Sequence, residues 1–126
     1  MIQRIKTSKA PAAIGAYSQG SIIGNLVFTS GQIGINPKTG DLVVDKFEEE
    51  VLQVLNNIKS VLEAGGSSIE NIVKLTVFIK DMSKFQLVNN VFSSYFSADF
   101  PARSVVEISE LPLSVNIEIE AIGVIK

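Results

Sequence analysis

The pattern of residues 45–64 limits the possible folds of this chain more than any other feature. Its apolar residues recur at helical spacing and form one stripe: Phe47, Val51, Val54, Leu55, Ile58, Val61 and Leu62. The pattern predicts an amphipathic helix that opens at Asp45, carries acidic residues in its first turns and ends at Gly65-Gly66. A helix with a single apolar stripe has to pack against an apolar surface supplied by the rest of the chain.

A β-sheet is expected to supply that surface, because several other segments have strand-like patterns. The predicted strands are residues 1–6, 18–23, 26–30, 73–79, 102–108 and 114–125. Gly24-Asn25 should join the second and third strands as a hairpin turn, since both residues tolerate positive φ. In the last strand, Val115, Ile117, Ile119 and Ala121 are predicted to face one way, and Asn116, Glu118 and Glu120 the other.

A second amphipathic helix is predicted between the fourth and fifth strands. Its apolar face comprises Phe85, Val88, Val91, Phe92, Tyr95 and Phe96. Ser83 and Gln86 resemble a capping box at its start, and Asp99-Phe100-Pro101 should end it.

This order of elements predicts one α+β domain spanning residues 1–126. Its two helices should cover one face of a six-stranded mixed sheet and leave the opposite face open. Hydrophobic residues make up 46% of only 126 residues, and so small a domain leaves much of its surface exposed. We therefore expect the chain to form an oligomer that buries the open face.

The composition excludes several kinds of chemistry. The chain has no cysteine and no histidine, so disulfides, thiolate or histidine metal sites and a Ser-His-Asp triad are impossible. The net charge is −2 and no basic run occurs, which disfavours nucleic acid as a partner. No apolar stretch is long enough to span a membrane, and residues 1–10 lack the apolar core of a signal peptide. Cytoplasmic residence is the simplest expectation.

Arg103 is the first candidate for a functional side chain. It follows Phe100-Pro101-Ala102 at the start of an apolar strand, where proline fixes the approach and small residues flank the guanidinium. This context suits a guanidinium that is positioned to bind a carboxylate through a bidentate pair. A surface arginine whose aliphatic part lies on the sheet explains it equally well. From the residues alone, the two interpretations remain open.

Other candidates lie near strand ends. Glu118 or Glu120 could pair with Arg103 and activate water if the open face is an interface, although a solvated outer face is the commoner arrangement. The spacing does not distinguish the two acids. Tyr17 could place its hydroxyl over a small ligand or simply pack, and Ser30-Gly31 could admit a ligand or form an ordinary turn.

Together, several segments resemble one family. They are Ala-Pro-Ala-Ala-Ile-Gly-Ala-Tyr-Ser-Gln at 10–19, Thr-Ser-Gly-Gln-Ile at 29–33, Asn-Pro-Lys-Thr-Gly at 36–40, Val-Phe-Ile-Lys-Asp-Met at 77–82, Phe-Pro-Ala-Arg-Ser at 100–104 and Ile-Glu-Ile-Glu-Ala at 117–121. Over its whole length the chain resembles the RidA/YjgF family of reactive-intermediate deaminases. The resemblance implies a chorismate-mutase-like fold and a homotrimer with a central barrel and active sites between subunits. It also implies cofactor-free and metal-free hydrolysis of enamines and imines, such as 2-aminoacrylate, to 2-keto acids and ammonia, the reaction of a 2-iminobutanoate/2-iminopropanoate deaminase.

The resemblance also implies roles for individual residues. Arg103 matches the arginine that grips the substrate carboxylate, and Glu118 matches the glutamate that activates water. The remaining matches are to substrate-binding residues: Tyr17, Ser30 and Asn89, Gly31 through its close backbone approach, and Val105 through its main-chain carbonyl. Val105 stands where many relatives have cysteine, and Ala16 and Gly34 replace frequent prolines, which puts only substrate preference in doubt.

Two other functions are weighed against deamination. A sensor could bind 2-keto acids without turnover, but such a protein would need Arg103 and not Glu118. An RNA-cleaving translation inhibitor is disfavoured by the negative net charge and the lack of histidine.

Overall fold

Six strands form one mixed sheet in the computed structural model, which describes residues 1–126. The strands are β1 (Gln3–Ile5), β2 (Gly20–Ile23), β3 (Leu26–Thr29), β4 (Ile72–Ile79), β5 (Ala102–Glu107) and β6 (Ile117–Val124). They lie in the order β1-β2-β3-β6-β4-β5, and only β4 and β5 are parallel. The predicted mixed six-stranded sheet is confirmed, and β5 is one of its two edges.

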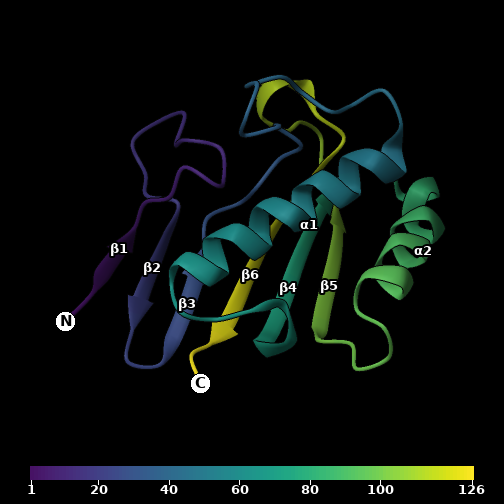
Figure 1. Ribbon diagram of the computed structural model, residues 1–126. Helices are drawn as coiled ribbons and strands as arrows, with labels where there is room; N and C mark the ends of the chain where they lie inside the picture. The colour runs from purple at the N-terminus through teal and green to yellow at the C-terminus, as the bar shows by residue number, and fades with distance from the viewer.

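Both helices cover the same face of this sheet (Figure 1). The longer helix, α1 (Phe47–Ala64), crosses the sheet diagonally, and α2 (Phe85–Tyr95) lies beside it next to β5. The predicted stripe of α1 is fully buried, and all seven of its residues belong to a core of 20 buried side chains between the helices and the sheet. This packing is what holds the sheet and both helices together.

Short local elements complete the chain and differ in part from the predicted caps. Three 3-10 turns are present: η1 (Ile69–Asn71), η2 (Met82–Lys84) and η3 (Pro112–Ser114). The predicted capping box at Ser83 is wrong, because Asp81 accepts hydrogen bonds from both the backbone N–H and the hydroxyl of Ser83. The hairpin turn is confirmed, with Gly24 at φ 57°.

The alternation predicted for the last strand holds only from Ile117 onward. Ile117, Ile119 and Ala121 face the helices within the main core. Val115 instead joins a small separate cluster with Ile33 and Ile35. The Asn116 side chain does not share the open face with Glu118, because its amide donates to Glu50 on α1. Residues 112–114 form a 3-10 turn with Leu113 and Ser114 at positive φ, which delays the start of the strand.

A bulge lies where β3 leads away from β6. Phe28 pairs with Ile122, but Gln32 pairs with Ile119, so the β3 side has one residue more between these pairs than the β6 side. The Ala121 N–H bonds to the Thr29 hydroxyl at 3.0 Å. After the extra residue, Gln32 exchanges backbone hydrogen bonds with Ile119, so that the following segment continues alongside β6.

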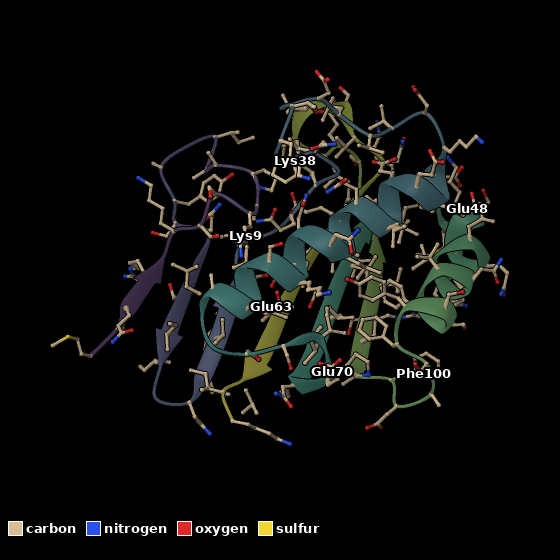
Figure 2. All side chains as sticks on the ribbon, viewed as in Figure 1. Lys9, Lys38, Glu48, Glu63, Glu70 and Phe100 are labelled. Carbon is tan, nitrogen blue, oxygen red and sulfur yellow. The ribbon has the colours of Figure 1, made fainter.

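The second face of the sheet carries no helix (Figure 1). Large apolar side chains remain exposed there, with Ile23 at 48%, Phe28 at 38% and Val106 at 43% of full exposure. Figure 2 places Glu48 and Glu63 near the two ends of α1 and Phe100 in the loop that enters β5. Apolar exposure on this scale is typical of a surface that a partner covers.

Candidate active site

Arg103 lies on β5, on the face that the helices cover. It pairs with Leu75 in register, and its Nη1 donates to Asn89 Oδ1 on α2 at 2.9 Å. The rings of Phe85 and Phe92 lie 5.2 and 5.3 Å from the Arg103 Cζ, within cation–π range. These contacts fix the guanidinium without neutralising it, so that its other N–H groups remain available to an anion.

A pocket of about 380 Å³ opens beside this guanidinium. We call it the arginine pocket, and its lining residues are Leu75, Asn89, Phe92, Ser93, Phe100, Pro101 and Arg103. Its volume suits a small organic acid, and its walls are apolar except around the guanidinium, Asn89 and Ser93. Arg103 and Asn89, each matched separately to a substrate-binding position, lie together within one chain.

Val105 lies two residues further along β5 on the same face as Arg103. Its side chain packs half-buried against the main core, so it does not enter the arginine pocket. Since the Ile108 N–H bonds to Ile79 on β4, strand alternation turns the N–H and C=O of Val105 away from β4, toward the free edge of the sheet. Only its main chain can therefore reach a ligand.

Glu118 lies on β6, on the open face, directly beside Gly31. A Cβ atom on Gly31 would stand 2.6 Å from Glu118 Oε2, so any side chain at position 31 would displace the carboxylate. Glycine is therefore required at position 31 for the carboxylate to occupy its place. The bulge after β3 sets this contact, because it fixes which residue of the following segment lies beside Glu118 on β6.

Tyr17 completes a small hollow around Glu118, which we call the acid pocket. It is lined by Pro11, Ala12, Ile14, Tyr17, Gly31, Gln32, Ile33, Ile35, Pro112 and Glu118. The Tyr17 hydroxyl accepts a hydrogen bond from the Ile14 N–H at 3.2 Å. Ser30 does not line the pocket, and its hydroxyl donates to the Ser18 carbonyl at 2.6 Å. Ser30 therefore ties the loop that carries Tyr17 to the end of β3.

The environments of Arg103 and Glu118 shift the pKa of each side chain in the direction expected of a partly buried charged group. Burial lowers the pKa of the Arg103 guanidinium, although arginine stays charged in proteins. Burial, with a smaller contribution from Glu120, raises the pKa of the Glu118 carboxyl. A carboxylate with a raised pKa is a better proton acceptor than an ordinary one, which suits a general base.

Arg103 and Glu118 do not meet within one chain. They lie on opposite faces of the sheet, and β4 separates their strands. Their partners on β4, Leu75 and Phe78, are three positions apart, so the backbone separation is roughly 14 Å from strand geometry. One chain therefore carries two half-sites, an arginine half-site and an acid half-site, that no small substrate could contact together.

The family model described as Endoribonuclease L-PSP matches residues 7–125, nearly the whole chain. The chain belongs to this family, the RidA/YjgF family. Among curated relatives, the Escherichia coli K12 protein named 2-iminobutanoate/2-iminopropanoate deaminase is 49% identical, over 98% of both chains. A crystal structure from Thermotoga maritima is 52% identical, with a TM-score of 0.94 over 98% of both chains.

A third RidA/YjgF relative, Escherichia coli TdcF, was crystallised with bound serine. It is 42% identical, with a TM-score of 0.93 over 98% of this chain and 99% of TdcF. Sequence reasoning did not identify the two rings that flank the guanidinium, Phe85 and Phe92, because it assigned both to the apolar face of α2. The signal was their spacing of seven residues with Asn89 between them, which places all three on one side of the helix.

No group of three or more acidic, histidine or cysteine side chains could hold a metal ion in this RidA/YjgF chain. Neither helix is both long and apolar enough to cross a bilayer. The charged groups of the two pockets are the Arg103 guanidinium and the partly buried Glu118 carboxyl.

Proposed function

We propose that this protein hydrolyses 2-imino acids, and the enamines that tautomerise to them, to 2-keto acids and ammonia. The observation that carries the proposal is the Arg103 guanidinium, held in a pocket by a neutral amide and two aromatic rings with no carboxylate bonded to it. Such a group is suited to bind a ligand carboxylate through a bidentate pair. The deaminase name of the 49% identical Escherichia coli protein supports the reaction.

The TdcF complex supports the same ligand class. Serine carries a carboxylate and a nitrogen on the same carbon, as does a 2-imino acid, and TdcF is 42% identical to this chain. In the proposed reaction, Arg103 binds the substrate carboxylate and thereby fixes the neighbouring C=N carbon. The apolar wall of the arginine pocket accommodates the short side chain of the substrate.

Glu118 has the role of the base. It accepts a proton from a water molecule as the water oxygen bonds to the imine carbon, which gives a carbinolamine. This proton passes to the imine nitrogen, which completes the carbinolamine. The carbinolamine hydroxyl then gives up its proton, through Glu118, to the same nitrogen, and the C–N bond breaks so that ammonia leaves while the C=O bond forms. Atoms and charge balance with water as the only second reactant. Tyr17 and Gly31 line the acid pocket in which this water would stand.

This mechanism needs two chains, because Arg103 and Glu118 lie on opposite faces of the sheet in one chain. We place the complete site between adjacent subunits of a homotrimer, in which the open sheet faces pack together. The exposed apolar side chains of that face and the free edge of β5 next to Arg103 support this assembly. Residence in the cytoplasm stays a prediction from the sequence.

The proposed reaction predicts faster release of ammonia and keto acid from 2-aminoacrylate or 2-iminobutanoate generated in situ by a dehydratase. The catalysed rate should rise in proportion to protein concentration and exceed the spontaneous rate. Heat-denatured protein serves as the control. If native protein does not accelerate release yet still binds 2-ketobutyrate by calorimetry, the chain is a keto-acid sensor and the proposal is wrong.

The shared site predicts that two inactive variants restore each other. Arg103→Ala and Glu118→Gln, co-expressed in equal amounts with different tags, should yield mixed trimers with about a third of the wild-type rate, because one of the three sites in each mixed trimer draws an intact residue from each of two subunits. Purification through both tags isolates the mixed assemblies. If these assemblies are as inactive as each variant alone, the two residues do not act across an interface.

RNA cleavage is the alternative suggested by the description of the family model. The net charge of −2 and the absence of histidine remove the features that RNA-cleaving sites generally use. No feature of the arginine pocket or the acid pocket favours a nucleotide over a small carboxylic acid.

A further inference from the structure

Glu50 on α1 is completely buried although it has no charged partner. Its Oε2 accepts the backbone N–H of Asn116 at 2.9 Å, and its Oε1 accepts the Asn116 side-chain amide at 2.7 Å. Both partners are neutral groups of one residue. Burying a carboxylate in this way is costly compared with an apolar side chain of similar size. A fold that needed only a filled core would not require Glu50 at this position.

The position of Asn116 makes this contact relevant to the acid half-site. Asn116 stands two residues before Glu118, and its carbonyl accepts the Lys80 N–H at 3.2 Å. The two hydrogen bonds that Asn116 donates to Glu50 therefore fix the backbone just before the start of β6. They also turn the Asn116 side chain away from the open face, where strand alternation would otherwise place it beside Glu118.

Glu50 also supports the other wall of the acid pocket. A Cβ atom on Gly34 would lie 3.0 Å from Glu50 Cγ, so the backbone at Gly34 rests directly on this side chain. Gly34 is three residues beyond Gly31. Seven residues further along α1, Asn57 donates to the carbonyls of Ile33 and Ile35, both at 3.0 Å. The segment that follows Gly31 is thus held against α1 by the packing of Gly34 on Glu50 and by the two hydrogen bonds from Asn57.

We propose that Glu50 is a positioning residue for the reaction, which sets the contact between Gly31 and Glu118 by holding Asn116 and Gly34 at once. This inference rests on the proposed role of Glu118 as the base. The Gly31–Glu118 contact has no spare room, since even a methyl group on Gly31 would collide with the carboxylate. A small shift of either segment therefore moves the base relative to the water that it activates.

An exchange of amide and carboxylate tests the inference. Asn116→Asp sets a second carboxylate against Glu50, and their repulsion should displace the start of β6. We expect kcat at mildly alkaline pH to fall roughly ten- to a hundredfold, as misplacement of a catalytic group does. KM should change little, because neither Glu50 nor Asn116 lines the arginine pocket. The double variant Glu50→Gln/Asn116→Asp restores a donor opposite the new acceptor and should recover kcat to within about twofold.

Glu50→Gln alone is the matched control. Asn116 can turn its amide to face the new glutamine, so both hydrogen bonds survive and kcat should stay near the wild-type value. A loss of kcat in Asn116→Asp that the double variant does not recover, or an equal loss through KM, would overturn the positioning role. If Asn116→Asp does not fold, Asn116→Ala supplies the same comparison, because it removes one bond without adding charge.

A readout that does not depend on turnover separates this inference from the proposed function. The backbone amide signals of Gly31 and Glu118 in NMR spectra should shift in Asn116→Asp and return in the double variant. If these amide signals do not shift, the positioning role of Glu50 is refuted even if the wild-type protein is an active deaminase. Conversely, wild-type protein without deaminase activity refutes the proposed function whatever the amide signals do.

Discussion

Replacement of Arg103 by alanine is expected to lower kcat/KM for a 2-imino acid by roughly 10²- to 10⁴-fold. The estimate follows from the loss of two charge-assisted hydrogen bonds to the substrate carboxylate, each worth about 1.5–3 kcal/mol. The protein should still fold, because the guanidinium makes a single hydrogen bond, to Asn89, and leaves a pocket that is already open to solvent. Initial rates of ammonia release measure the effect, and thermal unfolding checks the fold.

Two further variants sharpen this test. Arg103→Lys keeps the charge but not the fork, so it should recover only part of the loss. Arg4→Ala is the matched control, because Arg4 is the other arginine of the chain, bonds to Ser21 on β2 and lines neither the arginine pocket nor the acid pocket. Equal rates for wild type and Arg103→Ala would remove Arg103 from the mechanism.

Glu118→Gln is expected to reduce kcat by roughly 10²- to 10⁴-fold, the usual effect of losing a general base. Glutamine keeps the size of the side chain beside Gly31, so that the loss reports chemistry and not packing. Substrate binding at Arg103 should persist, and KM should change much less than kcat. Steady-state rates across a range of substrate concentrations separate the two parameters.

The same variant should be at least as stable as wild type at neutral pH. Burial and Glu120 raise the pKa of Glu118 in the folded chain, so the folded state holds this proton at a pH where the unfolded chain has lost it. The contribution of Glu118 to stability is therefore complete at low pH and declines as pH rises through the folded-state pKa. Glutamine removes that decline, and Tm values measured below and above the folded-state pKa of Glu118 should reveal the difference.

Glu120→Gln is the control for both effects of Glu118→Gln. Glu120 is exposed on the same face, two residues along β6, and raises the pKa of Glu118 through its charge. Its replacement should preserve kcat at neutral pH and move the acid limb of the pH–rate profile to lower pH. If Glu118→Gln keeps full activity while Glu120→Gln loses it, the two acids have been assigned the wrong way round.

Local patterns in the sequence were sufficient for most of the fold. The hairpin at Gly24, the stripe of α1 and the alternation from Ile117 to Ala121 each depend on neighbouring residues, and all three are confirmed. The face on which Arg103 lies could not be predicted in this way. It is set by the register of β5 against β4, a pairing between segments that are more than twenty residues apart.

The buried polar residues of α1 show a second limit of local reasoning. Glu50 was interpreted only as an acid near a helix N-terminus, where the dipole favours it. Its position three residues after Phe47 and four before Val54 places it inside the apolar stripe, and Asn57 follows seven residues later. A polar residue inside such a stripe indicates a specific buried partner, but only the structure identifies that partner as Asn116.

The opposite-face placement of Arg103 and Glu118 also has a consequence for how activity depends on the amount of protein. If each complete site forms only where two subunits meet, a dissociated chain keeps its fold and both of its half-sites and yet turns over nothing. Specific activity then obeys mass action and declines on dilution below the assembly constant. In a cell, the concentration of the chain would itself set a threshold for this activity.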